Sequence, residues 1–562
     1  MNYYKFLAIV IAALFMETGM SENVFDVVIY GSSPAALTAA IESGRHGKSA
    51  IIVCPETRIG GLTTGGLGQT DIGNKSAFGG LALNFYCDVA DFYKNPANWK
   101  YEKRSDYLPD GQCAGSLGAD SMWTFEPSAA LKILEGWEKK YALKIMRGEY
   151  LDRSPGGVIK QGTRIVAFKT LSGKVFAGKE FVDATYEGDL MAAAGVSYIA
   201  GREPNSRYGE RNSGIQRAKS VQHQLNPGVD PYVVKGDPAS GLLPFVEPDC
   251  PEADGEGDSR IQAYCFRMCL TDDPANRIAF VKPKGYDEKN YELLLRNLEL
   301  IDPKLLAEDA SNYWAYMPWI NSRMPNRKTD TNNRTGFSTD FIGRNWGWPE
   351  GSYAEREAIF REHLNYQMGL MWTLANHPRV PKAIREEVAR WGTCKDEFAD
   401  GPGYGWQSQL YVREGRRMIG DYVMTEANCR HQIVASRPVA MGAYTMDSHN
   451  CRRYVGKDGF AHNEGNIEDY ETLKLGPYPI DYGAIVPKKN ECENLFVPVC
   501  LSASHMAFGS IRMEPVFFAL GQVAGAAASL SIDAGCAVQD LDYGKLRTVL
   551  VAEGQLVESK RK

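Results

Sequence analysis

Two histidines lie in polar stretches of the sequence where they could take up a proton. His449 lies in Met446–Asn450, which we interpret as a polar turn, and His505 follows an apolar strand expected at Leu495–Cys500. A neutral imidazole is the side chain best suited to accept a proton near pH 7. We therefore take His505 as the first candidate for a catalytic base and His449 as the second, with ordinary structural histidines as the alternative.

Two neighbouring polar side chains are candidates for substrate contacts. Arg512 could bind an anionic group, since a guanidinium pairs well with oxyanions, or it could simply pair with Glu514 or another helix carboxylate. Asn450 could orient a substrate oxygen. We group both residues with the two histidines as catalytic candidates.

A scaffold for such chemistry is clearest at Phe25–Asp71. Phe25–Tyr30 predicts a buried strand, Pro34 suits the first turn of a helix that continues to Ser43, and Ala50–Cys54 predicts a second strand. A βαβ unit of this kind binds the diphosphate of a dinucleotide at the helix N-terminus.

The turn of this unit departs from the usual G-x-G-x-x-G pattern. Gly31, Ser33 and Ala36 stand where three glycines are usual, so the turn alone is equally compatible with an ordinary strand–helix connection. Glu56 lies near the offset at which a carboxylate meets the adenosine ribose, and the loop Arg58–Gly66 would let a cofactor approach its backbone closely. The order of these features favours a cofactor site over a glycine-rich surface loop.

At this point a resemblance to a known family becomes specific. It rests on GSSPAALTAA and ETRIGGLTTGGLGQTDIGN, on DATYEGDLMAAAG at 183–195, and on VPVCLSASHMAFGSIRMEPVFFALGQVAGAAA at 497–528. These stretches resemble an FAD-dependent oxidoreductase family of exported bacterial proteins, some labelled xanthan lyase. Its flavin domain is similar to those of glutathione-reductase-type flavoproteins and of the heterodisulfide reductase A subunit. The resemblance implies an α/β fold, with a Rossmann-like FAD-binding domain of glutathione-reductase type and an inserted α+β cap or substrate domain.

The resemblance also implies FAD as the cofactor and a set of residues that hold it. These are Gly31, Ser33, Pro34, Ala35, Ala36, Glu56, Arg58, Gly60, Gly61, Leu62, Thr63, Asp183, Glu187 and Gln522. The acids of the segment Tyr186–Leu190, Glu187 and Asp189, could instead be first-turn residues of the next helix that complement its dipole. The family usually has an acid where this chain has Cys54, so we expect Glu56 to make the ribose contact in its place.

The last strand and helix of similar flavoproteins return to the flavin. Pro515–Ile532 predicts a helix of small residues, and the resemblance implies that the junction His505–Pro515 lies at the isoalloxazine ring. The positive end of the helix dipole would then stabilise the anionic reduced flavin, and Arg512 could add to this effect. A packing helix beside a hydrogen-bonded loop histidine is the alternative.

Composition and the matched stretches together suggest how the chain is divided. We expect a signal peptide at 1–21, FAD-binding segments at 22–200 and 401–562 (the second with the returning strand and helix at 495–532), and an inserted cap at 201–400. In the cap, the stretch Asn312–Trp348 sets aromatic residues among amides, acids and bases. Such a stretch suits a polyhydroxylated substrate, or equally an aromatic core whose polar groups cap turns. Its aromatic residues are Trp314, Tyr316, Trp319, Trp346 and Trp348.

Two more helices are expected near the end of the cap. They are Tyr353–Asn376 and Gln407–Asn428. In the second helix, charged residues at i,i+3 and i,i+4 spacings would form surface pairs. These residues are Arg413, Glu414, Arg416 and Arg417.

Composition excludes several classes of protein. A hydrophobic content of 44% can build a full core, and a net charge of −6 without a basic stripe argues against a nucleic-acid partner. The 12 cysteines include no C-x-x-C pair, so we expect scattered buried thiols, with one or two bridges if the chain is exported, and neither a metal nor an iron–sulfur site. Lys5 and the apolar run Phe6–Met16 favour export to the periplasm or beyond, whereas translation from Met20 would give a cytoplasmic protein. No later segment is expected to cross a bilayer.

The sequence thus favours an FAD-dependent oxidoreductase. We expect it to oxidise a hydroxyl- or amine-bearing small molecule, such as a carbohydrate derivative, by hydride transfer to flavin N5, with an unknown electron acceptor. A second dinucleotide-binding βαβ is absent from the sequence, which argues against a nicotinamide partner. The alternatives are a polysaccharide lyase or hydrolase on the same scaffold, and a non-catalytic carbohydrate-binding protein.

Overall fold

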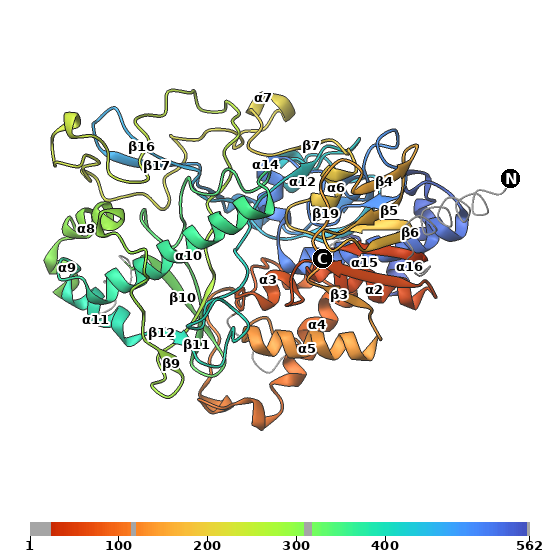
Figure 1. The fold of residues 1–562 in the computed structure, drawn as a ribbon, viewed down its shortest axis with the longest axis horizontal. Coiled ribbons are helices and arrows are strands. Elements are labelled where there is room, and N and C mark those ends of the chain that lie inside the picture. The colour runs from red at the N-terminus through yellow and green to blue at the C-terminus, as the bar shows by residue number, and fades with distance from the viewer. Residues whose placement is uncertain (1–23, 114–119, 308–316, 559–562) are drawn as a thin grey trace.

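A seven-stranded sheet brings the predicted cofactor segments together (Figure 1). The computed structural model describes residues 24–113, 120–307 and 317–558. The strand order is β3-β2-β1-β6-β5-β4, with β20 beside β6; the pairs among β3, β2, β1, β6 and β20 are parallel, and β4 and β5 add antiparallel pairs. The strands are β1 (Val24–Tyr30), β2 (Ala50–Cys54), β3 (Ile145–Arg147), β4 (Val158–Gln161), β5 (Arg164–Lys169), β6 (Val175–Asp183) and β20 (Leu495–Phe496). This arrangement confirms the expected α/β fold with a Rossmann-like sheet.

Side chains of β1 alternate between two cores. Val27 and Ile29 enter the larger core beneath the helices, whereas Val28 and Tyr30 enter a smaller core on the other face. A parallel strand buried on both faces needs such a continuous apolar run. Helices near this sheet are α2 (Pro34–Arg45), α3 (Gly61–Thr64), α4 (Gly80–Phe92), α5 (Pro127–Lys140), α6 (Asp189–Ala193), α14 (His505–Ile511), α15 (Glu514–Ala534) and α16 (Tyr543–Ala552).

Helix α15 lies directly against α2 because glycines remove the side chains between them. A Cβ on Gly521 would come within 2.3 Å of the carbonyl oxygen of Ala35, and one on Gly525 within 2.4 Å of that of Ala39. By length and composition α15 is also the one helix among the described residues that could cross a membrane, although the sequence suggested none there. Its most apolar window is 94% buried inside the protein, as in the core helix of a globular protein.

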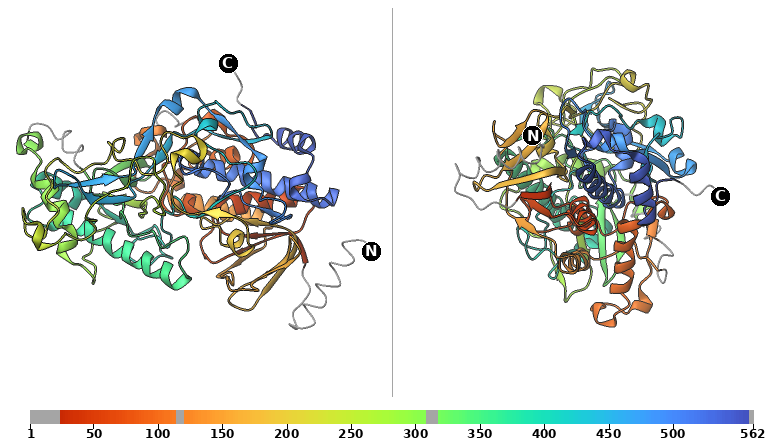
Figure 2. Two further views of the ribbon diagram at one scale, coloured as in Figure 1. Left: turned by 90° about the horizontal axis from the view of Figure 1, so that it is seen from above. Right: turned by 90° about the vertical axis from the view of Figure 1, so that its right-hand side faces the viewer.

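A second region is built mainly by the residues between β7 and β13. Its five-stranded antiparallel sheet has the order β10-β11-β8-β12-β9, and α8 to α11 lie around it, away from α2 and α15 (Figures 1 and 2). Its elements are α7 (Asn205–Tyr208), β8 (Met268–Thr271), β9 (Arg277–Ile278), α8 (Glu292–Glu299), α9 (Pro303–Ala307), β10 (Trp319–Met324), β11 (Lys328–Asn333), α10 (Tyr353–Asn376), α11 (Lys382–Arg390) and β12 (Gly392–Cys394). Helix α10 has the predicted bounds, and the domain boundaries themselves stay a prediction.

Later segments return to both regions in short two-stranded pairs. The hairpin β16–β17 lies beside the second region, near α8 (Figure 1). The remaining elements are β7 (Tyr198–Ile199), β13 (Arg417–Met418), α12 (Glu426–Cys429), β14 (Pro438–Gly442), β15 (Met446–Ser448), β16 (Arg452–Val455), β17 (Ala461–Glu464), β18 (Ile467–Asp469), α13 (Glu471–Leu475) and β19 (Tyr478–Asp481).

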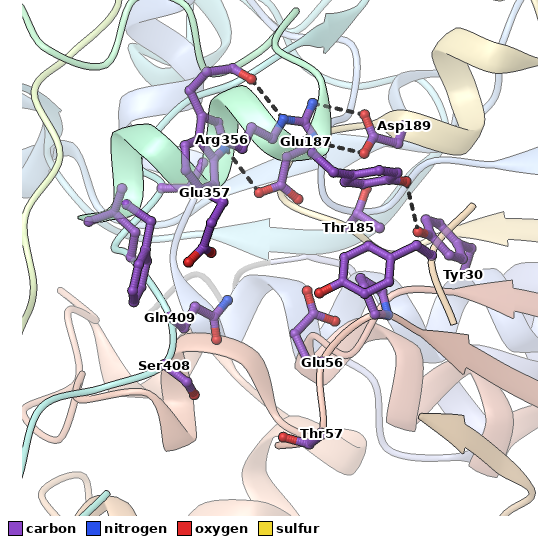
Figure 3. A pocket seen from close by; sticks show the side chains of 17 residues that line it. Tyr30, Glu56, Thr57, Thr185, Glu187, Asp189, Arg356, Glu357, Ser408 and Gln409 are labelled. Carbon is purple, nitrogen blue, oxygen red and sulfur yellow. Dashed lines mark hydrogen bonds and ion pairs between the residues drawn. The ribbon is translucent and has the colours of Figure 1, made fainter. Parts of the chain in front are cut away.

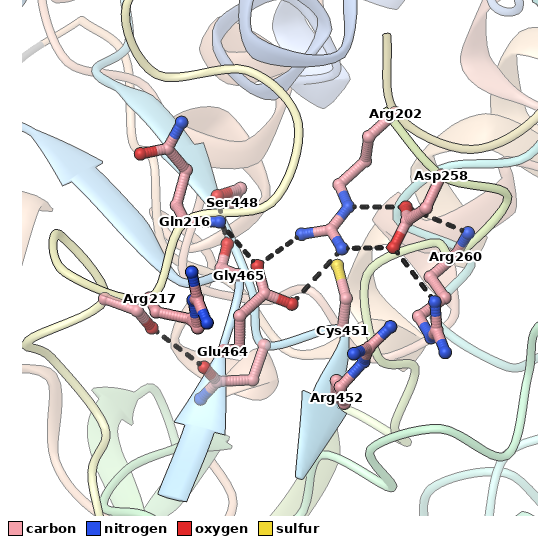
Figure 4. Close-up of polar contacts among 12 residues, drawn as sticks. Arg202, Gln216, Arg217, Asp258, Arg260, Ser448, Cys451, Arg452, Glu464 and Gly465 are labelled. Atoms are coloured by element: carbon pink, nitrogen blue, oxygen red, sulfur yellow. Dashed lines mark hydrogen bonds and ion pairs between the residues drawn. The ribbon is translucent and has the colours of Figure 1, made fainter. Parts of the chain in front are cut away.

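A buried arginine, Arg202, joins the hairpin β16–β17 to the segment that follows β7. Arg202 donates to Asp258 at 2.9 and 2.6 Å and to Glu464 of β17 at 2.7 Å (Figure 4). Its side chain is fully buried, so removing either carboxylate would leave part of a buried charge uncompensated. The network fixes where the segment after β7 crosses β17.

Several predictions about local structure were wrong. No helix spans Gln407–Asn428; within it only β13 and α12 are regular, and the rest is irregular backbone. Gly415 and Gly420 explain part of this, since glycine disfavours a helix interior. The strand expected at Leu495–Cys500 is limited to β20, and Met446–Ser448 is a strand, not a turn.

Some predictions concern residues that the structure does not describe, and the one about disulfide bridges is corrected. The predicted signal peptide at 1–21, together with Trp314 and Tyr316, lies outside the described residues. No disulfide joins the cysteines of the described residues, and all but Cys87 and Cys536 are buried, so the structure contains none of the bridges considered for an exported chain.

Replacing Gly521 with alanine has two opposite effects on the free energy of unfolding, one through helix propensity and one through packing. Alanine favours a helix over glycine by about 1 kcal/mol, but here its methyl group would overlap the backbone of α2. We expect Gly521→Ala to lower the free energy of unfolding by about 1–3 kcal/mol, measured by urea denaturation. The control is Gly136→Ala in α5, where the added methyl group meets no atom within 4 Å; it should stabilise the protein, and equal effects at both positions would contradict the account.

Candidate cofactor and catalytic site

The turn from β1 into α2 has no room for a side chain at its first residue. Gly31 has φ of +119°, and a Cβ there would lie 2.6 Å from the carbonyl group of Ala184, which follows β6. Ser33 donates its hydroxyl to the same carbonyl at 2.6 Å. Within the described part of the chain, the buried backbone N–H groups of Ser32 and Ser33 have no hydrogen-bond acceptor. Free N–H groups at a helix N-terminus are the usual setting for an anion such as a diphosphate.

A cavity of ≈ 310 Å³ opens beside this turn, where β1, β2 and β6 end (Figure 3). One wall comes from these strand ends, and the other from α10 and the segment 408–412 of the second region. The lining residues are Tyr30, Pro55, Glu56, Thr57, Tyr150, Thr185, Glu187, Asp189, Trp348, Tyr353, Arg356, Glu357, Phe360, Ser408, Gln409, Leu410 and Val412. Ligands of open α/β sheets bind at this edge, outside the carboxyl ends of the strands.

Two predicted acids face this cavity. Glu56 follows β2, and its Oε2 is buried without a hydrogen bond among the described residues. Burial, with the nearby charge of Glu187, raises the pKa of Glu56 to about 7. Glu187 accepts a hydrogen bond from Trp348 Nε1 at 3.2 Å, and burial raises its pKa too, although Arg356 opposes the shift. A ligand hydroxyl would give the unpartnered Glu56 oxygen a donor.

Asp183 supports the site from beneath. Its carboxylate accepts hydrogen bonds from Thr185 N and Oγ1 and from Met191 N, so it fixes the turn between β6 and α6. Burial nevertheless raises its pKa to about 6. The carboxylate that meets the arginines of the second region is Asp189, whose pKa is lowered despite burial because Arg356 binds it at 2.6 and 2.9 Å.

The glycine loop packs against the first turn. Gly60 N donates to Ser32 O at 2.7 Å, and a Cβ on Gly61 would lie 2.2 Å from the hydroxyl of Tyr186. Arg58 donates to Thr64 O and to Asp400, so it braces the loop and does not enter the cavity.

Glu514 closes this loop from the start of α15. It accepts hydrogen bonds from Thr63 N at 3.1 Å, from Thr63 Oγ1 at 2.7 Å and from Tyr186 Oη at 2.9 Å, while Tyr186 accepts one from Leu62 N at 3.0 Å. Burial raises the pKa of Glu514 to about 7. No local pattern indicates that Tyr186 and Glu514 meet, because they lie more than three hundred residues apart.

Gln522 lies further along α15 and outside the cavity. Its Oε1 accepts a hydrogen bond from Leu81 N at 2.8 Å, and its Nε2 is buried without a hydrogen bond in the described structure. The contact ties α15 to the start of α4. Pro34, Ala35 and Ala36 form the first turn of α2.

His505, the first residue of α14, is held by two glutamates. Its Nδ1 lies 2.9 Å from Glu414 Oε2, and its backbone N–H donates to Glu203 at 3.1 Å. His505 and Arg417 lower the pKa of Glu414 to about 2 against the cost of its burial. A charged Glu414 accepts a hydrogen bond from Nδ1–H, and no described residue hydrogen-bonds to Nε2. Nε2 is therefore the nitrogen left to accept a proton.

The second histidine belongs to the same hydrogen-bonded network. Gln262 Nε2 donates to Glu414 at 2.8 Å, and Gln262 Oε1 accepts from the backbone N–H of His449 at 3.0 Å. The His449 ring lies 2.7 Å from Asp340 and 3.5 Å from Asp447. The structure thus brings His505 and His449 together through Gln262.

Arg512 and Asn450 are separated from each other. Arg512 Nη2 donates to Asp447 at 3.1 Å, not to the Glu514 considered as a partner, and its Nε and Nη1 are buried without a hydrogen bond among the described residues. The Asn450 side chain instead contacts Ser220 and the carbonyl of His223. Of the predicted catalytic residues, only Asn450 has its side chain tied to the segment 220–223.

The histidine network adjoins Tyr186, whose hydroxyl accepts a hydrogen bond from Leu62 of the glycine loop. Gly415, the neighbour of Glu414, approaches Tyr186 so closely that a Cβ would lie 2.9 Å from the Tyr186 carbonyl oxygen. Sequence reasoning missed Glu414, which it placed on the surface of a helix. The glycine at 415 was the one available sign that this segment is not helical.

The buried carboxyl of Glu514 predicts a pH effect on the ligand-free protein. Because its pKa is raised from 4.5 to about 7, the protonated Glu514 carboxyl adds to the free energy of unfolding. This contribution is complete below pH 4.5 and is lost as pH rises through 7. Glu514→Gln cannot ionise, so we expect it to avoid up to about 3 kcal/mol of this loss. Its unfolding midpoint should therefore fall less than that of the parent protein between pH 5 and pH 8. The exposed Glu386→Gln serves as control; parallel pH profiles for all three proteins would contradict the assignment.

Comparisons with known proteins agree with the kind of cofactor expected. The family model of FAD dependent oxidoreductases matches residues 26–550. No curated protein matches the sequence.

Three solved structures are similar to part of this chain: a flavin-containing monooxygenase, a hydroxylase and a deaminase. The flavin-containing monooxygenase of Stenotrophomonas maltophilia is 18% identical, over 33% of this chain and 43% of that one, with a TM-score of 0.19. The OxyS anhydrotetracycline hydroxylase of Streptomyces rimosus is 14% identical, over 33% and 36%, with a TM-score of 0.22. The L-amino acid deaminase of Proteus vulgaris is 15% identical, over 33% and 54%, with a TM-score of 0.21. In each case the match spans less than two thirds of the solved chain. Because the family model covers nearly the whole sequence, the chain belongs to the family of FAD-dependent oxidoreductases.

Proposed function

We propose that this FAD-dependent oxidoreductase oxidises a hydroxyl- or amine-bearing small molecule, such as a carbohydrate derivative, with His505 as the base. The observation that carries the proposal is the His505–Glu414 pair, at 2.9 Å, next to Gly415, which packs against Tyr186 beside the glycine loop. It leaves Nε2 of a buried imidazole without a partner among the described residues. A base arranged in this way serves a reaction in which a substrate proton must leave.

The residues of the first turn and the cavity suit FAD. The free N–H groups of Ser32 and Ser33 fit a diphosphate, and the unpartnered oxygen of Glu56 fits a ribose hydroxyl. Gly31, which has no room for a Cβ, allows the backbone of this turn to approach its neighbours. When bound, FAD supplies the group that accepts the two electrons of the oxidation.

The proton path follows from the orientation of the imidazole. Glu414 accepts the Nδ1–H hydrogen bond, which fixes the tautomer with its lone pair on Nε2. When Nε2 takes the proton of a substrate hydroxyl or amine, the imidazolium that forms is stabilised by the adjacent carboxylate. Glu414 is thus a positioning residue, since it acts through His505.

Arg512 would bind a different part of the substrate. It follows α14, so it lies about 10 Å along the helix from His505, given a rise of about 1.5 Å per residue. Its two buried N–H groups without hydrogen bonds suit a substrate oxygen, and His449 lies next to the same Asp447. Of the aromatic residues expected to stack on a sugar, Trp319 is fully buried, whereas Trp348 borders the cavity.

Two other functions are kept as alternatives because they use the same residues. A polysaccharide lyase or hydrolase would employ His505 as a base without oxidising its substrate. A non-catalytic carbohydrate-binding protein would leave Nε2 without a role, so the His505–Glu414 geometry favours an enzyme. Export of the chain and the identity of its electron acceptor stay predictions.

The test combines a substrate screen with a variant of the base. The FAD-loaded protein is mixed without oxygen with sugars, polyols and amines, and loss of the flavin absorption identifies a substrate. We expect His505→Gln to keep its FAD but to reduce the rate of flavin reduction about 10²- to 10⁴-fold. The control is His462→Gln, which changes an exposed histidine of β17.

Two results would contradict the proposal. An unchanged rate of flavin reduction in His505→Gln would show that His505 is not the base. Cleaved or unsaturated sugar products formed without any loss of flavin absorption would favour the lyase or hydrolase.

A further inference from the structure

Two helices that end near each other bring three potential metal ligands together, far along α2 from the cofactor turn. Glu42 and His46 lie one turn apart at the end of α2, and Glu553 follows the last residue of α16. His46 Nε2 lies 3.2 Å from Glu42 Oε1 and 3.1 Å from Glu553 Oε1. One ligand atom from each residue lies within 4.8 Å of the other two.

The two distances to His46 Nε2 are slightly shorter than the edges of a metal coordination shell. Zinc binds imidazole nitrogen and carboxylate oxygen at about 2.0–2.2 Å in a tetrahedron, whose ligands are then about 3.3–3.6 Å apart. Glu42 Oε1 and His46 Nε2 are buried atoms that make no well-aligned hydrogen bond in the described structure. Two ligand atoms without such hydrogen bonds, each close to the other or to a carboxylate oxygen of Glu553, are arranged to share a single ion.

The local electrostatics also favour a cation. The negative ends of the α2 and α16 dipoles both point toward this place, because each helix ends there. The Glu42 side chain is fully buried, and its only cationic partner among the described residues besides His46 is Arg45 at 3.3 Å. Burial and the neighbouring Glu553 raise the pKa of Glu42, so a proton competes with a metal for this carboxylate.

We propose that Glu42, His46 and Glu553 bind a divalent cation of the zinc type, with water as the fourth ligand. The side chains of His46 and Glu553 are 21% and 23% exposed, so the cluster lies close to the protein surface. The spacing of the cysteines and histidines predicted no metal site, and Glu553 lies far along the chain from Glu42 and His46. The ion would fasten the C-terminal helix α16 to the far end of the helix that begins at the cofactor turn, which is a structural role.

The experiment measures zinc binding to tag-free, FAD-loaded full-length protein. After dialysis against a chelator, the protein is titrated with Zn²⁺ by calorimetry, and its metal content is measured by elemental analysis after gel filtration. Co²⁺ is then used as a spectroscopic probe, since its visible absorption distinguishes tetrahedral from octahedral coordination. His46→Gln and Glu553→Gln remove one ligand each, and His462→Gln again serves as the matched histidine control, because His462 pairs only with Asp458 on the surface.

We expect about one equivalent of zinc in the parent protein and in His462→Gln, with tetrahedral Co²⁺ absorption in both. The two ligand variants should keep their FAD but bind zinc at least about tenfold more weakly. Absence of zinc binding in the parent protein, or equal binding in parent and ligand variants, would overturn the proposal. In that case Glu42 and Glu553 form a carboxylic acid–carboxylate pair that shares a proton, and Glu553→Gln would change stability without any dependence on zinc.

Discussion

The site depends above all on the close contact between the first turn and the end of β6. Gly31 can adopt its conformation because it lacks a side chain, and the carbonyl of Ala184 occupies the space that a Cβ would need. This contact places the N-terminus of α2, the end of β2 and the start of α6 at one edge of the sheet. The same edge receives Glu56 and Glu187, which line one cavity beside the turn that holds the free N–H groups of Ser32 and Ser33.

A second constraint is the burial of many charges between the two regions. Arg413, Arg416 and Arg417 are buried, and each pairs with a carboxylate from a distant segment: Asp340, Asp189 and Glu203. Such pairs add little net stability, but breaking one leaves an uncompensated charge in the interior. Their value here is positional, since they hold the segment that carries Glu414 against both His505 and Tyr186.

Local patterns in the sequence predicted much of the fold but little of the site. The runs of apolar residues in β1 and β2, the proline at the start of α2 and the small residues of α15 gave these elements close to their observed bounds. The predicted helix is absent over 407–417. The charged residues there have helical spacing, but Gly415 and the many buried ion-pair partners favour extended backbone. The pairing of Glu414 with His505 and of Glu514 with Thr63 joins residues far apart in the chain, which no local pattern could reveal.

The central claim is that FAD binds at the carboxyl ends of β1, β2 and β6, with Glu56 in contact with it. The most direct measurement is the dissociation constant of FAD for the ligand-free protein, compared with Glu56→Gln and with Glu357→Gln, an exposed glutamate on the opposite wall of the cavity. At pH 8, above the pKa of about 7 of Glu56, replacing its charged carboxylate by a neutral amide acceptor should weaken binding about 10- to 100-fold in Glu56→Gln and leave Glu357→Gln near the parent value. Equal affinities for the parent and Glu56→Gln would contradict the placement of the cofactor in this cavity.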